Sequence, residues 1–244
     1  MSYIENPKTK GSGVICAIPQ STKCPINCPE CFFSQGRSYL EPLDKNLPNM
    51  PDFLVAHDDR VVRINDGNDS NIDREKVISD TSHYKMAFFN TSIPKDLESF
   101  PRPVVLTLNP GDMTDKAIHI VDPIPKNLMF VRVRTNAWNL DLVEQACLHY
   151  SDIGTPVVLT FMAYHNIESI PEAHRDNYVL RKRTMNEYYA ITTDAWHDIM
   201  GIWEDELQVY SCGKIEGERG KTSCRYCGNC LREFFATNER MKGG

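Results

Sequence analysis

The chain has 244 residues, of which 41% are hydrophobic and 25% are charged, a composition ordinary for one substantial globular domain with a small appendage. Its formal net charge of -6 gives no overall attraction to nucleic acid or to an anionic membrane. No apolar run approaches the roughly 20 residues of a membrane span, and the first residues lack the basic and apolar segments of a secretory signal. We therefore expect a cytoplasmic protein with no membrane or nucleic-acid partner.

Six near-continuous apolar runs are separated by turns, loops and helical patterns. Such runs are typical of strands in a parallel sheet that is covered on both faces. The expected strands cover residues 13–19, 61–65, 85–91, 104–109, 129–135 and 156–163. Amphipathic patterns predict helices over 71–82, 140–150 and 194–204, with Ser70 or Asn71, Asn139 and Thr193 as N-caps. Residues 34–51 and 166–190 read as mainly irregular.

Nine cysteines in a chain without an export signal favour metal binding over disulfides, because a reducing compartment keeps thiols free. Cys16 and Cys147 stand alone in apolar surroundings, so we expect them to be small buried hydrophobes. The other seven form two clusters, Cys24, Cys28 and Cys31 near the start and Cys212, Cys224, Cys227 and Cys230 near the end.

The first cluster directly follows the first expected strand. Pro25 and Pro29 argue against a regular helix there, so the cysteines lie on a shaped loop. Thiolates gathered this closely suit an iron–sulfur cluster. Three ligands would leave one iron of a four-iron cube open, just as a catalytic zinc keeps an open position. A partial zinc site is the alternative reading.

These two spacings resemble the signature of the radical SAM superfamily. The resemblance implies a four-iron four-sulfur cluster on Cys24, Cys28 and Cys31 whose open iron chelates S-adenosylmethionine. An electron from the cluster then cleaves the cofactor to methionine and a 5′-deoxyadenosyl radical, which abstracts a hydrogen atom from the substrate. Glu30 stands where the family usually has an aromatic residue, and two phenylalanines follow Cys31 instead.

Further cofactor contacts are expected at the carboxyl ends of the strands, where parallel α/β folds bind their ligands. By resemblance, Gly67, Asn68 and Asp69 match the turn that holds the methionyl amino group, although a plain strand-to-helix turn is the alternative. Arg132 and Arg134 point to one side of their strand, and Arg134 suits the cofactor carboxylate unless the two form a surface face or a salt bridge. Asn109, with Thr107, is the candidate for the ribose hydroxyls.

The second cluster of cysteines could supply all four ligands of a metal site. Cys212 ends a probable strand at 207–211, and the two-residue gaps among the other three resemble ferredoxin-type ligation. Four thiolates complete a coordination shell, so an auxiliary iron–sulfur cluster or a structural zinc fits this cysteine-rich segment. Radical SAM enzymes that modify peptides often carry cysteine-rich C-terminal extensions, but the spacing here differs from theirs.

Together these patterns predict an α/β fold, a partial (β/α)6 barrel of mainly parallel strands over 1–205, with a small cysteine-rich metal-binding extension over 206–244. The expected function is that of a radical SAM enzyme acting on an unidentified substrate. Its expected partners are S-adenosylmethionine and an electron donor such as flavodoxin or ferredoxin. The alternative is a non-catalytic iron–sulfur or zinc protein that acts as a redox or interaction module.

Overall fold

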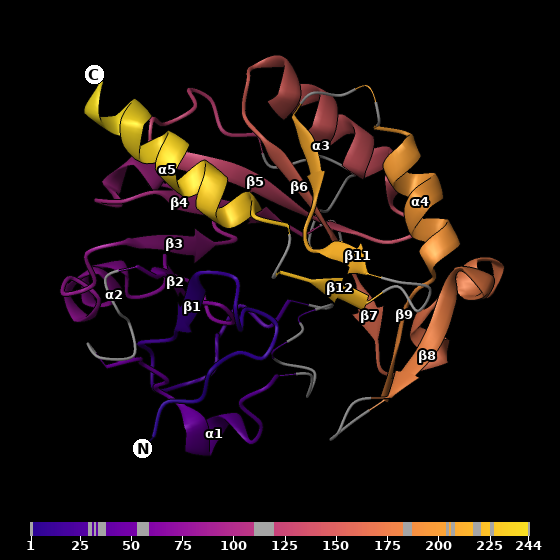
Figure 1. The fold of residues 1–244 in the computed structure, drawn as a ribbon, viewed down its shortest axis with the longest axis horizontal. Helices are drawn as coiled ribbons and strands as arrows, with labels where there is room; N and C mark the ends of the chain where they lie inside the picture. Colours follow the sequence, from indigo (N-terminus) through magenta and orange to yellow (C-terminus); the bar gives the residue numbers. More distant parts are fainter. Residues whose placement is uncertain are drawn as a thin grey trace.

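A computed structural model describes residues 2–28, 31, 33, 38–52, 59–109, 120–182, 187–203, 205, 208–216, 221–224 and 227–243. The positions of Glu30 and of the phenylalanine directly after Cys31, both noted in the sequence, lie outside these residues. The fold is an α/β structure built around one curled sheet of parallel strands (Figure 1).

The central sheet contains seven strands in the order β1-β2-β3-β4-β5-β6-β10, and every neighbouring pair is parallel. All six predicted strands are present, but the predicted count of six is wrong because β10 adds a seventh beside β6. The strands are β1 (Val14–Ala17), β2 (Val61–Ile64), β3 (Ala87–Thr91), β4 (Val104–Leu108), β5 (Leu128–Thr135), β6 (Val157–Phe161) and β10 (Val209–Ser211). Whether 206–244 forms a separate extension remains a prediction, since β10 lies within that range.

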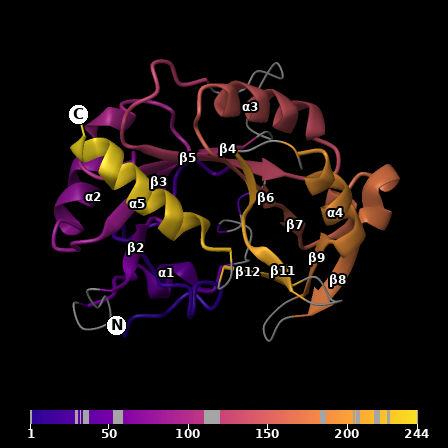
Figure 2. The same cartoon turned by 45° about the horizontal axis from the view of Figure 1, so that its top comes forward.

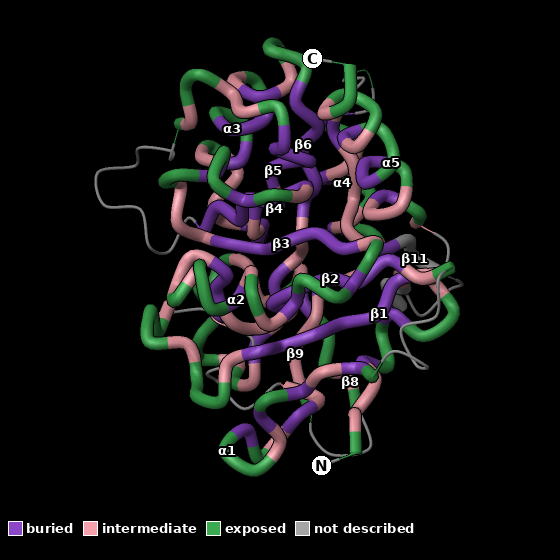
Figure 3. The backbone as a smooth tube through the Cα atoms, turned by 90° about the vertical axis from the view of Figure 1, so that its left-hand side faces the viewer, coloured by how far each residue is buried: buried purple, intermediate pink, exposed green. Residues whose placement is uncertain are grey.

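Helices α2 (Arg74–Asp80) and α3 (Leu140–Asp152) cover one face of the sheet. Val77 of α2 and Tyr150 of α3 pack there against the strand residues that point to that side. The strands are apolar almost throughout because both of their faces are covered, and Figure 3 shows β1 and β3 as continuous buried segments. Each helix joins two neighbouring strands, as in the predicted β/α units.

Helix α5 (Asn229–Lys242) packs on the opposite face, which we call the α5 face (Figures 1 and 2). Its Phe234 contacts Phe88 and other apolar side chains in the amino-terminal halves of the strands. Arg240 fixes the far end of the helix by donating to the carbonyl of Lys126 at 3.0 Å. The α5 face is therefore covered by protein near the strand starts.

Residues 166–190 are more regular than the sequence suggested. Strands β8 (Tyr178–Lys182) and β9 (Glu187–Ile191) form an antiparallel sheet with β7 (Ala163–Tyr164). The prediction missed them because this stretch mixes charges among its tyrosines and aliphatic residues, and Val179 and Leu180 remain exposed. The small sheet packs through Tyr164 and Tyr178 against α4 (Thr193–Gly201).

Three predicted helix starts differ in detail. Helix α2 begins after Asp73 rather than after Ser70 or Asn71. Asn139 precedes α3 as expected, but its side-chain oxygen accepts from the Asn136 amide at 2.9 Å instead of capping the helix. The cap of α4 is Thr192 rather than its neighbour, since its hydroxyl accepts from the amide of Ala195 at 3.2 Å.

The remaining elements are short. They are α1 (Leu43–Asn46), the 3-10 turns η1 (Leu97–Ser99), η4 (Ile167–Ser169) and η5 (Glu172–Asn177), and an antiparallel pair of β11 (Lys214–Glu216) and β12 (Lys221–Ser223). In the described part of the chain, no helix has the length and apolar character needed to span a bilayer.

Candidate functional site

The three-cysteine loop leaves the carboxyl end of β1 and is tied to the turn that follows β2. Gln20 donates from its side-chain amide to the carbonyl of Asp69 at 2.9 Å. Asn68 donates from its side-chain amide to the carbonyl of Thr22 at 2.9 Å. Because β1 and β2 are neighbouring parallel strands, these two loops meet at one edge of the sheet, where open α/β sheets bind ligands.

Cys24, Gly67 and Asn68 line one small pocket at this edge. Phe33 lines it too, and its ring lies directly over Gly67, where a Cβ atom would overlap the ring. Gly67 is therefore required for the close approach of the two loops rather than for a special backbone angle. The structure thus brings three residues predicted from sequence into one pocket with a fourth, Phe33, for which the sequence analysis proposed no role.

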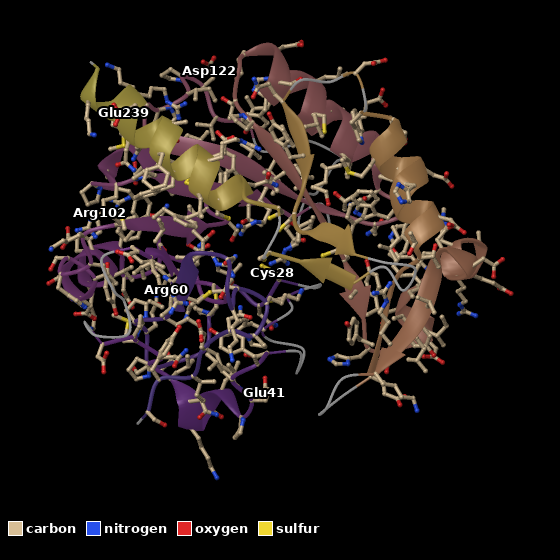
Figure 4. The ribbon with its side chains drawn as sticks, in the orientation of Figure 1. Cys28, Glu41, Arg60, Arg102, Asp122 and Glu239 are labelled. Atoms are coloured by element: carbon tan, nitrogen blue, oxygen red, sulfur yellow. The ribbon has the colours of Figure 1, made fainter. Side chains whose placement is uncertain are left out.

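The Cys24 thiol is half-buried. Burial raises its pKa to about 11, and the Asp69 carboxylate and Cys31 add to that rise, while backbone hydrogen bonds from Ile26 and Asp69 lower it. The backbone amide of Cys31 donates to the carbonyl of Cys28 at 3.1 Å. Cys28 lies near the centre of the molecule as seen in Figure 4.

Asp69 is buried, and its carboxylate is engaged by the protein itself. One oxygen accepts from the hydroxyl of Thr91 at 2.7 Å and from the amide of Asn71 at 2.9 Å. The other accepts from the amide and hydroxyl of Ser92, at 2.6 and 2.9 Å. The carboxylate therefore anchors the turn after β2 to the end of β3.

A row of polar side chains crosses the α5 face beyond the part that α5 covers. Each of the first six strands contributes at least one such residue, at a position that alternates with apolar residues facing α2 and α3. We give the name polar row to six of them, Cys16, Arg63, Asn90, Thr107, Arg132 and Thr160. Strand β5 carries a second one, Arg134, closer to its end.

The two remaining predicted cofactor contacts lie further along the same sheet edge. Asn109 directly follows β4 and is buried, and Arg134 is the second-to-last residue of β5, on the same face as Arg132. They lie two and three strands away from β2. Among the described residues, neither lines the pocket that contains Cys24. A ligand that contacts all of these residues would have to extend across the sheet edge.

The second cysteine cluster also comes together. Cys212 follows β10, Cys224 and Cys227 precede α5, and Cys230 is in its first turn, yet all four line one pocket on the α5 face. Opposite them the sheet contributes side chains from β1, β2, β5 and β6. The floor of this four-cysteine pocket comprises Val14, Arg63, Phe130, Arg132 and Val158.

Burial dominates the electrostatics of two of these thiols. It raises the pKa of Cys224 to about 12 and that of Cys230 to about 11, and in both cases nearby thiols contribute further. Arg63 opposes the rise at both cysteines, and Arg132 opposes it at Cys230. The four-cysteine pocket thus contains two cations that favour the ionised form of these two thiols.

Within the described part of the chain, no group of three or more His, Cys, Asp or Glu side chains is arranged so that it could hold a metal ion as the structure stands. By the chemistry of their donors, both cysteine sets suit soft metal centres, since thiolates favour iron–sulfur clusters and zinc. The metal assignments therefore remain predictions. A scan of protein-family models and searches of curated proteins and of solved structures found no match for this chain.

Arg63 is the residue of this region that the sequence analysis passed over. It lies inside the apolar run of β2, forms an ion pair with Asp66, and donates to the sulfur of Cys16 at 3.4 Å. Burial by itself lowers the pKa of Arg63, but Asp66 and the neighbouring thiols hold it well above its ordinary value. A charged residue in the middle of an otherwise apolar strand was the available signal, because such a charge needs a buried partner.

Proposed function

We propose that this protein is a radical SAM enzyme in which Cys24, Cys28 and Cys31 hold a four-iron four-sulfur cluster that binds S-adenosylmethionine. The observation that carries the proposal is the place of the cysteine loop. It follows β1 at the carboxyl edge of a curled parallel sheet and packs against the turn after β2. That edge is where such sheets bind ligands.

When bound, the cluster supplies an electron, received from a donor such as flavodoxin or ferredoxin, that cleaves S-adenosylmethionine to methionine and a 5′-deoxyadenosyl radical for hydrogen abstraction. The chain's own residues position the cofactor. Backbone amides of Ile26 and Asp69 stabilise the Cys24 thiolate, as hydrogen bonds to a charged form do. Arg134 is assigned the cofactor carboxylate, for which a guanidinium has the matching fork.

The polar row supports a substrate site beside the cofactor. Cys16, Arg63, Asn90 and Thr107 are buried in an otherwise apolar sheet, and Arg132 and Thr160 are half-buried. Among the described residues, Thr160 Oγ1 and the Nε atoms of Arg63 and Arg132 have no hydrogen-bond partner. Polar groups of this kind fix the orientation of small ligands in apolar pockets. The substrate itself is unidentified, and the row is compatible with any small polar molecule of suitable length.

The experiment is anaerobic reconstitution with iron and sulfide, followed by dithionite and S-adenosylmethionine, with 5′-deoxyadenosine measured by mass spectrometry. We expect product from the wild-type chain and none from the triple variant Cys24→Ala, Cys28→Ala, Cys31→Ala. Cys147→Ala, which removes a buried thiol from α3, is the matched control and should retain cleavage. Cleavage by the triple variant would contradict the assignment of the loop.

The rival function is a non-catalytic iron–sulfur or zinc protein that carries electrons or binds a partner. The observation in its favour is the four-cysteine pocket, which by its donors suits a metal centre without S-adenosylmethionine. The same assay separates the two functions. A wild-type chain that is fully loaded with iron but yields no 5′-deoxyadenosine would support the rival.

A further inference from the structure

The four-cysteine pocket is formed by the tertiary fold rather than by the cysteine segment alone. Its walls hold Cys212, Cys224, Cys227 and Cys230, and its floor is the α5 face of the sheet. Together with the solvent at its mouth, the pocket encloses about 440 Å³. Its position places any bound group over β2 and β5, against Arg63 and Arg132 of the polar row.

Arg132 directs unused hydrogen-bond donors into this pocket. Its Nη1 donates to the side-chain oxygen of Asn90 at 3.2 Å. Its Nε and Nη2 atoms are buried and have no partner among the described residues. These two atoms form the edge of the guanidinium that binds an anion with two parallel hydrogen bonds. Leaving charged donors buried and unpaired costs more than about 1–3 kcal/mol, so the edge calls for an acceptor beyond the described residues.

Arg63 places a second cation at the same floor. Asp66 and Cys16 engage one end of its guanidinium, while Nε is buried without a partner among the described residues. It lines the pocket with Arg132, and Cys224 and Cys230 influence its pKa. The pocket therefore presents two guanidinium groups to a site surrounded by four sulfurs.

We propose that the four cysteines hold an iron–sulfur cluster inside the half-barrel, and that Arg132 and Arg63 neutralise its charge, with Arg132 donating from Nε and Nη2 to its sulfur. Four thiolates outweigh the positive charge of the metal core that they bind, so the bound centre is an anion. Cluster charge and hydrogen bonds to sulfur set the reduction potential of such centres. This site is separate from the Cys24 loop, although it deepens the proposed function by placing a second redox centre beside the polar row.

An iron–sulfur cluster fits this pocket better than zinc or a free anion. Tetrahedral zinc is enclosed by its four thiolates and brings no further hydrogen-bond acceptor to the arginines. A cluster adds sulfides that can accept from Arg132 Nε and Nη2. A free carboxylate or phosphate would bind Arg132 but would be repelled by four neighbouring thiolates. Reduction adds one electron to the cluster, supplied by a one-electron donor such as dithionite, and requires no proton.

The test uses the Cys24→Ala, Cys28→Ala, Cys31→Ala variant, in which only the second site can bind metal. It is reconstituted without oxygen, once with iron and sulfide and once with zinc alone. We expect iron and sulfide in similar amounts, charge-transfer absorption, and a paramagnetic signal after dithionite reduction. Retention of zinc with no retained iron and sulfide would overturn the cluster.

The arginine role is tested in the same background by redox titration. Arg132→Leu should lower the midpoint potential, because it removes a cation that favours the reduced, more negative cluster. It should also speed loss of iron to a chelator about tenfold, as loss of an outer partner does. Arg132→Lys keeps the positive charge, so its midpoint potential should lie close to that of the background protein. If Arg132→Leu does not fold, Arg132→Lys still tests the hydrogen bonds to sulfur, since lysine cannot donate from a guanidinium edge and should lose iron faster.

Arg102→Leu is the matched control, since Arg102 donates to Thr81 and Ser82 carbonyls away from the pocket. It should leave both the potential and the rate of iron loss unchanged. An unchanged potential in Arg132→Leu would overturn the arginine role. These results are independent of the proposed function, because the triple variant has no cofactor-cleaving site. Failure of 5′-deoxyadenosine production in the wild type would leave them unaffected.

Discussion

Substitution of Gly67 by alanine tests whether the cysteine loop is held by its contact with the turn after β2. The added Cβ would lie 1.9 Å from the nearest atom of the Phe33 ring. Carbon atoms in contact are normally about 3.5–4.0 Å apart, so the methyl group and the ring would overlap. Phe33 is only 9% exposed and packs with Ile18, Leu40 and other apolar residues, so the ring has no free space to enter. One of the two loops must move.

Overpacking of this kind costs about 1–3 kcal/mol. For a chain of this length, that corresponds to a loss of roughly 2–12 °C in Tm. Thermal and urea unfolding measure the change in stability. Alkylation of Cys24, followed by peptide mass spectrometry, measures the displacement of the loop, which we expect to speed modification of this half-buried thiol. Production of 5′-deoxyadenosine should fall in parallel.

Two further variants isolate the cause. Phe33→Leu combined with Gly67→Ala removes the ring that the new methyl group meets, so it should recover part of the lost stability. Gly201→Ala adds the same methyl group at the end of α4, where no described atom lies within 4 Å, and should be neutral or slightly stabilising. If Gly67→Ala were as stable and as slowly alkylated as the wild type, the contact would not hold the loop.

Three other predictions concern single residues. Asp69→Ala removes the acceptor for Thr91 and Ser92 and should cost about 3 kcal/mol in urea unfolding, whereas a loss below about 0.5 kcal/mol would show that the anchor is dispensable. Burial raises the pKa of Cys16 from 9.0 to about 12, so its stabilising effect is complete below pH 9 and is lost as the pH rises toward 12. In the metal-free reduced protein, this thiol alone should lower the unfolding free energy by up to about 1.4 kcal/mol per pH unit in that window, and Cys16→Ala should flatten the slope measured at pH 8 and pH 10. Thr192→Ala removes the α4 cap and should cost about 1 kcal/mol in thermal unfolding, and an equal loss in Thr193→Ala would refute the assignment of the cap.

The strands of the central sheet were predictable because they are buried on both faces. A run such as Val104–Leu108 has no polar position that faces solvent, so its length and composition suffice. The antiparallel strands β8 and β9 lacked this signal. Val179 and Leu180 are exposed in β8 although they are apolar, so the pattern of apolar residues does not follow the pattern of burial.

Only those features of the candidate site that depend on residue type and local spacing could be predicted from the sequence. The cysteine spacing and the turn at Gly67 could be recognised locally. The contact between Gly67 and Phe33 could not, because it joins loops from two neighbouring strands whose register the sequence does not state. For Asp69 the sequence suggested a cofactor contact, which stays a prediction, but it could not show that the carboxylate accepts hydrogen bonds from Thr91 and Ser92 at the end of β3.

The sequence alone determined the α/β class and the six apolar strands. It also determined that seven cysteines form two sets, which have the chemistry of soft-metal ligands. Tertiary structure alone decided that β10 is a seventh parallel strand, and that Arg63 and Arg132 lie beneath the second set of cysteines. The physical reason is the separation along the chain of the residues that interact. Strand propensity and ligand spacing are properties of neighbouring residues, whereas burial of a charge beside a thiolate depends on which distant strands the sheet places side by side.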